Sequence, residues 1–184
     1  MKCKMAAQDW PKPLISLRHA AAWEIALLPN IEYRADAVYA DYPEFADLQN
    51  QQSIVPGRAD DLPPGAIVIL AEMDSALSGF IFGHPLDDCL FVGQLSVVPE
   101  AQKQGIGSRL LAALGDAAQQ AGCPGLSLIT YGHLPFNAPF YARRGFRVLR
   151  EDELSPEIAK EYATDTAKWS RYGPRVVMGR RFAD

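Results

Sequence analysis

The sequence predicts an α/β fold of the mixed α+β kind, in which helices flank a central, mostly antiparallel sheet of about six or seven strands. Two observations support this prediction. Three β-type runs follow one another closely at residues 66–72, 76–83 and 88–98, and short segments rich in turn residues separate them. Apolar residues recur at helical spacing over residues 25–38 and again over residues 106–118. Closely spaced strands between two such helices are typical of an antiparallel meander packed against helices.

The remaining elements follow from the same patterns. A short strand at residues 14–17 precedes the first helical stretch, which Pro29 should kink or divide. Residues 41–64 are rich in proline and predict a loop with one short helix around residues 44–52. Further strands are expected at residues 126–131, 146–150 and 175–182, and further helices at residues 138–144 and 156–163.

Size and charge limit the kinds of protein that this chain can be. It has 184 residues, of which 48% are hydrophobic and 22% charged, with a formal net charge of −4. Such a chain can bury a core and is too apolar for intrinsic disorder. We predict one domain over residues 1–184, with residues 1–13 as a flexible N-terminal segment. A net negative charge provides no basic field for a phosphate backbone, so a cationic ligand is a better expectation than nucleic acid.

The cysteines and the hydropathy pattern indicate the compartment. Cys3, Cys89 and Cys123 are an odd number of widely spaced thiols without a CxxC pair. They predict free thiols in a reducing compartment, not a disulfide or a zinc site. No segment approaches the roughly 18 uninterrupted apolar residues of a membrane span. We therefore expect a cytoplasmic protein without a metal ion or a membrane partner.

The most informative segment is residues 95–110, where a predicted strand runs into a glycine-bearing turn that opens a leucine-rich helix. The first N–H groups of a helix lack intrahelical partners and lie at the positive end of its dipole, so they can hold a phosphate. Gly105 and Gly107 would let the backbone approach that anion. Leu110 stands where a dinucleotide fingerprint needs its third glycine, and the lysine of a P-loop is missing. A purely structural glycine turn is the alternative.

Two motifs resemble landmarks of the GNAT N-acetyltransferase superfamily. The pattern Gln102, two residues, Gly105, one residue, Gly107 resembles its acyl-CoA pyrophosphate loop. Residues 141–146, Tyr-Ala-Arg-Arg-Gly-Phe, resemble its second landmark, and the order of strands and helices is similar over residues 15–150. The resemblance implies the GNAT fold, whose sheet is splayed between its fourth and fifth strands, and acetyl-CoA (coenzyme A) as the cofactor.

The resemblance also implies which residues would hold that cofactor. The backbone of Leu95, Ser96 and Val97 would pair with the pantetheine amides as an added strand. Asn137 would contact the cofactor or, as an equal alternative, cap the helix that follows it. The pyrophosphate would lie on the N–H groups of the turn formed by Gln102, Lys103, Gln104, Gly105, Ile106, Gly107 and Ser108.

The sequence indicates a catalytic tyrosine but leaves open which group accepts the proton of the amine. Tyr141 matches the superfamily position that usually protonates the leaving thiolate, a plausible role because a tyrosine hydroxyl can donate to a thiolate. The alternative is that its ring only packs. Residues 91–98 and 126–131, which would form the splayed fourth and fifth strands, carry no carboxylate. The proton acceptor would then be Glu32, His133 or a water held by Gln94, Thr130 or main-chain carbonyls.

Acids and aromatic residues gather in and after the first helical stretch, where this fold usually admits its acceptor. Glu32, Tyr33 and Asp36 are the expected acceptor residues. Carboxylates and aromatic faces both attract a cationic amine. A solvated helix face with half-buried tyrosines is the alternative interpretation.

We therefore predict an acyltransferase that moves the acetyl group of acetyl-CoA to a primary amine of a small molecule, by direct attack in a ternary complex. One alternative is a non-catalytic acyl-CoA-binding or regulatory GNAT module. Another is an acetyltransferase of protein or peptide amines. The acidic composition disfavours a GNAT toxin that acts on aminoacyl-tRNA. The expected partner is a small amine, with no nucleic acid, and a homodimer is compatible with these expectations.

Overall fold

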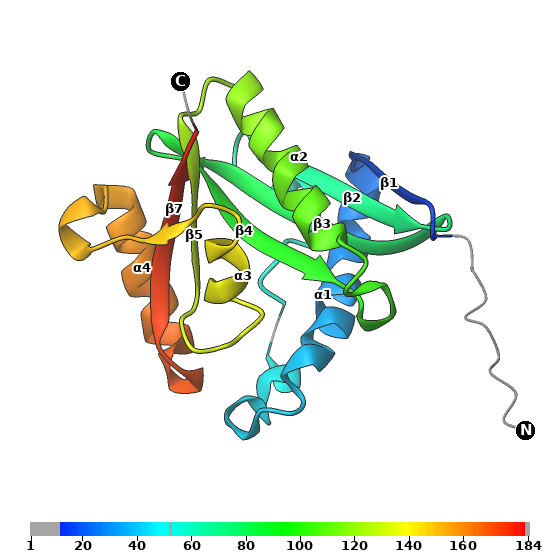
Figure 1. Cartoon of the computed structure of the whole chain (residues 1–184), viewed down its shortest axis with the longest axis horizontal. Coiled ribbons are helices and arrows are strands. Elements are labelled where there is room, and N and C mark those ends of the chain that lie inside the picture. Colours follow the sequence, from blue (N-terminus) through cyan, green and yellow to red (C-terminus); the bar gives the residue numbers. More distant parts are fainter. Residues whose placement is uncertain (1–11, 52, 183–184) are drawn as a thin grey trace, which may run out of the picture.

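A computed structural model describes residues 12–51 and 53–182 (Figure 1). Within them, seven strands form one sheet in the order β1-β2-β3-β4-β5-β7-β6. All neighbouring strands are antiparallel except β4 and β5, which are parallel. The predicted fold class is therefore confirmed. The strands are β1 (Ile15–His19), β2 (Ile67–Met73), β3 (Ala76–Leu86), β4 (Cys89–Val97), β5 (Gly125–Tyr131), β6 (Arg147–Val148) and β7 (Arg175–Arg181).

Helices cover both faces of the sheet. Figure 1 shows α2 running across the strands, and α2 packs on β2, β3, β4 and β5. The opposite face carries α1, which packs on β3 and β4, and α4, which packs on β7. The α-helices are α1 (Leu28–Ala35), α2 (Ile106–Gln120), α3 (Ala138–Ala142) and α4 (Pro156–Trp169).

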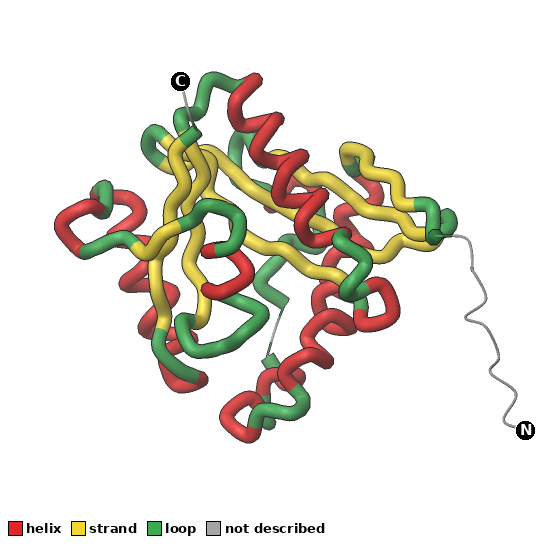
Figure 2. The backbone as a smooth tube through the Cα atoms, in the orientation of Figure 1, coloured by secondary structure: helices red, strands yellow, loops and turns green. Residues whose placement is uncertain are grey.

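The helical segment before β2 is divided next to Pro29, which is one of the two outcomes expected there. A 3-10 helix, Ala22–Leu27, leads into α1, and Pro29 lies in the first turn of α1, where a residue without an N–H group costs nothing. The expected helix at residues 44–52 is replaced by short 3-10 turns in a long connection, as Figure 2 shows.

The described residues bear on several other predictions. Residues 1–11 of the expected flexible segment 1–13, and with them Cys3, lie outside the described part of the chain. Cys89 and Cys123 are free thiols. In the described part, no helix is both long enough and apolar enough to cross a membrane. The last helix, α4, continues to Trp169 instead of ending at residue 163.

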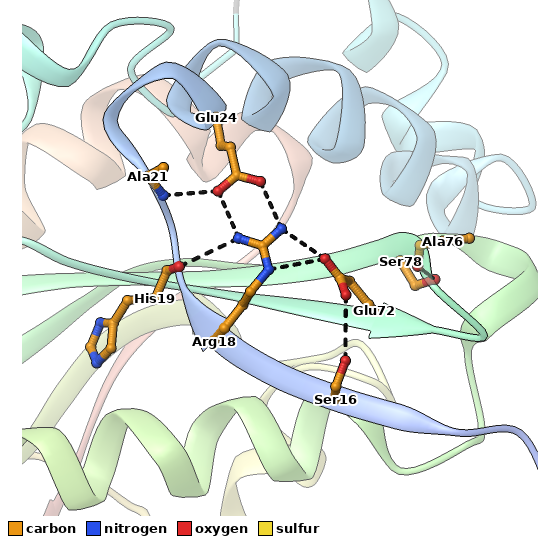
Figure 3. Close-up of polar contacts among 8 residues, drawn as sticks. All are labelled: Ser16, Arg18, His19, Ala21, Glu24, Glu72, Ala76 and Ser78. Atoms are coloured by element: carbon orange, nitrogen blue, oxygen red, sulfur yellow. Dashed lines mark hydrogen bonds and ion pairs between the residues drawn. The ribbon is translucent and has the colours of Figure 1, made fainter.

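An arginine clamp ties the start of the first helical segment to the edge of the sheet (Figure 3). Arg18 on β1 donates two hydrogen bonds of 2.7 Å to the Glu24 carboxylate and two of 2.7 and 3.0 Å to Glu72 on β2. Glu24 is only 3% exposed, and the backbone N–H of Ala21 also donates to it, at 2.8 Å. A buried carboxylate needs such partners. The clamp therefore fixes the direction in which α1 leaves the sheet.

The clamp predicts an acid-sensitive contribution to stability. Hydrogen bonding by Arg18, followed by that of the Ala21 N–H group, lowers the pKa of Glu24 from 4.5 to about 2. Since the folded pKa is depressed, the stabilisation is complete above the unfolded pKa and disappears as the pH falls through the folded value. We expect Glu24→Gln to lower the Tm at pH 7, and the difference from wild type to shrink as the pH falls from 5 to 2. Thermal unfolding followed by circular dichroism measures this.

A matched control removes an exposed carboxylate from α4. Glu157 lies 3.9 Å from Lys160 on the solvent side, and such surface pairs contribute little. Glu157→Gln should leave the Tm close to wild type at every pH. A Tm difference for Glu24→Gln that stays constant from pH 7 to pH 2 would contradict the role of the clamp.

Candidate active site

Strands β4 and β5 separate soon after they meet. They pair only between residues 90–92 and residues 126–128, although β4 continues to Val97 and β5 to Tyr131. The β5-facing edge of β4 from residue 93 to residue 97 therefore has no strand partner. Backbone N–H and C=O groups on such an edge can pair with an extended ligand. This splay is the one that the family resemblance implied.

A β-bulge lies where the splay begins. Phe82 pairs with Gln94 but Gly83 pairs with Val92, so Gly93 is an extra residue on β4. A Cβ atom on Gly93 would lie 2.3 Å from the Phe82 ring, so only glycine fits there without a shift. The sequence analysis did not identify Gly93. The available signal was a glycine inside an otherwise apolar strand, which often marks a bulge or a close approach.

Beside the splay lies a cavity of about 710 Å³. Its walls come from α1, the connection between α1 and β2, the strands β3, β4, β5 and β7, and the helices α3 and α4. The cavity therefore collects residues from almost the whole length of the chain. Six predicted site residues line it: Glu32, Tyr33, Asp36, Leu95, Asn137 and Tyr141.

The α1 wall of the cavity is acidic. Glu32 is 4% exposed, and its carboxylate accepts hydrogen bonds from the Ser53 hydroxyl and, at 3.3 Å, from the Ile54 N–H group. Burial raises the pKa of Glu32, and these donors act against that rise. Asp36 lies one helical turn later, and no other described residue forms a hydrogen bond or ion pair with its carboxyl group. Burial, together with the charge of Glu32, raises the pKa of Asp36 to about 7.

Two tyrosines and Asn137 form the inner wall. Tyr39 stacks on Phe45 with ring centroids 4.6 Å apart, and its hydroxyl is in hydrogen-bond contact with the Asn137 side chain. Burial raises the pKa of Tyr39 to about 12, and burial also raises the pKa of Tyr141. The Tyr141 ring meets the edge of Phe146. Asn137 is the N-cap residue of α3 by position, but its side chain makes no capping hydrogen bond.

The wall formed by α4 and β7 was missed by the sequence analysis. Asp165 accepts two hydrogen bonds from Arg175, at 2.6 and 2.8 Å, and the guanidinium carbon lies 4.1 Å from the centre of the Tyr131 ring. The Lys168 ammonium lies 4.5 Å from the centre of the Trp169 ring. No motif marks these residues, and Asp165, Lys168 and Trp169 follow the expected end of their helix. The Asp165 and Arg175 charges neutralise each other.

The glycine turn lies beyond the end of β4 and does not line the cavity. Gly105 directly precedes α2 with a φ of 82°, a left-handed conformation that suits glycine. Of the two glycines, only Gly105 has a positive φ. The Gln102 side chain donates to the Val97 carbonyl at 3.1 Å, so it ties the turn to the strand. Lys103, Gln104 and Gly105 are exposed, and Ile106 is buried in the core.

Arg144 links the glycine turn to α3, which the sequence analysis did not foresee. Its Nε donates to the Ser108 hydroxyl at 3.1 Å, and its Nη1 donates to the Phe140 carbonyl at 2.6 Å. Its guanidinium carbon lies 3.6 Å from the centre of the Phe140 ring. A Cβ on Gly107 would lie 3.4 Å from the same ring. The turn and the helix that carries Tyr141 are thus held together by Arg144 and Phe140.

The other candidate proton acceptors are not well placed. His133 does not line the cavity, and its Nε2 lies 3.3 Å from a Glu44 carboxylate oxygen. Thr130 also does not line it, because side chains alternate along a strand and its neighbours Ile129 and Tyr131 do. Gln94 lines the cavity, with its amide donating to the Ser96 hydroxyl at 3.1 Å. Of these three residues, Gln94 is the one that lines the cavity.

Residues 21–146 match the Acetyltransferase (GNAT) family. This chain belongs to that family. It is 35% identical over 78 residues to an amino-acid acetyltransferase of Neisseria meningitidis, a match that covers 42% of this chain but only 17% of that protein. It is 28% identical over 111 residues to the uncharacterized N-acetyltransferase YhfO of Bacillus subtilis, with 57% of this chain and 73% of that protein covered.

Solved GNAT structures share the fold. One is the N-acetylglutamate synthase from Neisseria gonorrhoeae in complex with coenzyme A and N-acetyl-glutamate, with a TM-score of 0.62 at 23% identity over 93% of this chain and 36% of that chain. Another is the ribosomal-protein-S18-alanine N-acetyltransferase from Escherichia coli, with a TM-score of 0.63 at 17% identity over 93% of this chain and 96% of that chain. At these identities the likeness concerns the fold alone.

The bulge at Gly93 yields a stability prediction. Gly93→Ala forces a Cβ against the Phe82 ring, and such overpacking typically costs about 1 to 3 kcal/mol. Urea unfolding should show this loss in Gly93→Ala. Replacing the ring by a smaller side chain should reduce this cost. Gly93→Ala should therefore lower the free energy of unfolding less in the Phe82→Leu background than in the wild-type background. Gly57→Ala is the control, since its Cβ would meet Pro29 at an ordinary 3.7 Å. If the losses in the free energy of unfolding caused by Gly93→Ala and Phe82→Leu simply add in the double variant, the bulge does not depend on the contact between residue 93 and the Phe82 ring.

Proposed function

We propose that this protein is an N-acetyltransferase that moves the acetyl group of acetyl-CoA to a primary amine of a small, positively charged molecule. Membership of the GNAT family supports the reaction class. The observation that carries the proposal is that one cavity contains the unpaired edge of β4, Tyr141 and the acidic wall of α1. The strand edge would bind the acetyl donor, Tyr141 would supply a proton, and the acidic wall would bind a cationic acceptor.

The residues at the splay fit acetyl-CoA. The unpaired edge of β4 over residues 93–97 offers backbone donors and acceptors to the pantetheine amides. The exposed turn before α2 offers N–H groups to the pyrophosphate, and Lys103 adds a positive charge there. The neisserial N-acetylglutamate synthase of the same fold was solved with coenzyme A, which agrees with this assignment.

The chain's own groups supply proton transfer and charge stabilisation. Acetyl-CoA supplies the acetyl group as a thioester, whose carbon–sulfur bond breaks as the carbon–nitrogen bond to the acceptor forms. A tyrosine hydroxyl has an ordinary pKa of about 10 and burial raises that of Tyr141 further, so this hydroxyl is protonated at neutral pH and is in the form that can donate to a departing thiolate. Backbone N–H groups on the open edge of β4 can donate to the carbonyl oxygen as negative charge develops on it.

The acceptor wall favours a cationic amine over a neutral or anionic one. Glu32 on α1 and Asp36, the residue directly after α1, are one helical turn apart and both line the cavity, and Tyr33, which is 54% exposed, adds an aromatic ring there. An alkyl amine is protonated at pH 7, so it would meet complementary charge. The opposite side is bounded by α4, including Trp169 and Lys168. A cavity bounded in this way suits a small molecule better than an extended peptide.

The decisive experiment measures thiol release from acetyl-CoA with a panel of amines, amino acids and short peptides. We expect turnover with small cationic amines and a 10- to 1,000-fold lower kcat for Tyr141→Phe, with coenzyme A affinity unchanged, because this variant loses only the acid. The control is Phe136→Leu, which alters an aromatic residue that contacts Tyr39 but does not line the cavity. Acetyl-CoA binding without turnover of any amine would instead support a non-catalytic acyl-CoA-binding module.

A second variant tests the cofactor assignment. In Gly107→Val the branched side chain projects from the first turn of α2 beside Phe140, where the pyrophosphate is proposed to approach the backbone. Calorimetry should show coenzyme A binding weakened by more than about 10-fold, since a β-branched residue blocks close approach. Gly57→Val, in a loop remote from the turn, should bind like wild type. Equal affinity in Gly107→Val and wild type would contradict the assignment of the turn.

A further inference from the structure

A cationic amine must lose a proton before its nitrogen can attack, and the proposed function leaves that proton without an acceptor. The strands β4 and β5 carry no carboxylate. The acids that line the cavity come instead from the helical segments around it: Glu32, Asp36, Asp61, Glu161 and Asp165. These acids differ in their hydrogen bonds and burial, and these differences indicate which of them can accept a proton.

Three of these acids are either paired with an arginine or exposed to solvent. Asp165 is held by two short hydrogen bonds from Arg175. Asp61 and Glu161 are exposed to solvent. None of the three combines burial with a free carboxyl group.

Glu32 has a structural task. The Ser53 hydroxyl and the Ile54 N–H group both donate to its carboxylate, so it fastens residues 53–55 to α1. A proton on Glu32 would compete with these bonds. Asp36 lies four residues later on the same face of the helix, half-buried, and no hydrogen bond or ion pair to its carboxyl group is found in residues 12–51 and 53–182.

We propose that the Asp36 carboxylate is the proton acceptor of the reaction and takes the proton of the bound ammonium group. The assignment rests on the proposed function and names a catalytic residue for it. It replaces the water relay and His133 that sequence considerations suggested.

The surroundings of Asp36 connect it to Tyr141. The charge of Asp36 raises the pKa of Tyr39, whose hydroxyl contacts the side chain of Asn137. Tyr39 in turn acts electrostatically on Tyr141. Tyr39 is therefore close to both Asp36 and Tyr141, and all three side chains line one cavity. An acceptor nitrogen between them would have a proton acceptor on the α1 side and a proton donor on the α3 side.

The pKa of Asp36 suits a proton acceptor that works at neutral pH. Burial, with the charge of Glu32, raises its pKa to about 7, so a large fraction of the group is ionised at neutral pH and can still hold a proton. Other charged or titratable groups share the cavity. Lys168 and Arg175 are its cations, Arg175 being neutralised by Asp165, and the remaining groups are His84, Tyr33 and Tyr131. Lys168 acts on Glu32, and neither cation is a significant influence on Asp36.

The proton balance closes without a further reactant. One proton moves from the ammonium nitrogen to a carboxylate oxygen of Asp36, and the electron pair left on nitrogen forms the new bond to carbon. Tyr141 protonates the leaving sulfur and regains its proton from the nitrogen of the new amide. Asp36 then releases its proton to water. Overall, one ammonium and one thioester give one amide, one thiol and one proton.

The test compares Asp36→Asn, which keeps the shape and removes the base, with Asp41→Asn, an exposed acid outside the cavity lining. Using the best acceptor of the amine panel, we expect kcat/KM at pH 7 to fall about 100-fold or more in Asp36→Asn and to stay unchanged in Asp41→Asn. The wild-type rate should rise through pH 7 and then level. In Asp36→Asn it should keep rising toward pH 9, where free amine becomes available.

A second measurement needs neither acetyl-CoA nor an acceptor. Carbon-13 NMR of the carboxyl groups should show one resonance that titrates near pH 7, is missing in Asp36→Asn and titrates lower in Glu32→Gln, because that variant removes the neighbouring charge. A wild-type enzyme that is active on amines while Asp36→Asn keeps its rate and pH profile would overturn this assignment alone. A wild-type protein that acetylates no amine would overturn the proposed function and the assignment together.

Discussion

The separation of β4 from β5 is the constraint on which the rest of the structure depends. A continuous parallel pair would satisfy every backbone group between these strands, but pairing stops after Val92 and Leu128. The unpaired groups on β4 must then find partners in water or in a ligand. The same separation opens the sheet beside Gly93, where the bulge turns the backbone and the Phe82 ring occupies the space of the missing side chain. The cavity exists because these two strands do not close.

The walls of the opening are held by interactions remote from it. On one side, the hydrogen bonds of Arg18 with Glu24 and Glu72 fix the first helical segment to the sheet edge. Phe45, in the connection that follows α1, packs on Tyr131 and Tyr172 in a second apolar cluster. These contacts hold the segments that precede and follow α1. Its acidic face therefore keeps a fixed position over the splay, which is what a preorganised site requires.

Burial gives ordinary side chains unusual proton affinities in this cavity. The same desolvation that raises the pKa of Tyr141 also raises the pKa of Asp36 into the neutral range. Asp165, by contrast, accepts two hydrogen bonds from Arg175. Partners supplied by the tertiary structure, and not residue type, thus decide which acid can exchange a proton near pH 7. An acid and a base of this kind are what an acetyl transfer to a protonated amine would require.

The sequence by itself determined the mixed sheet, the glycine turn before α2 and the family, because strand alternation, helical spacing and turn chemistry are local patterns. It also placed Glu32, Asp36, Asn137 and Tyr141 among the candidates. It did not reveal the bulge, Arg144 or the α4 wall, and its candidate proton acceptors were Glu32, His133 or a held water molecule. Only the tertiary structure decided these points. Which side chains share a cavity, and which are already paired, depends on packing between segments more than a hundred residues apart, and no local pattern in the sequence records that.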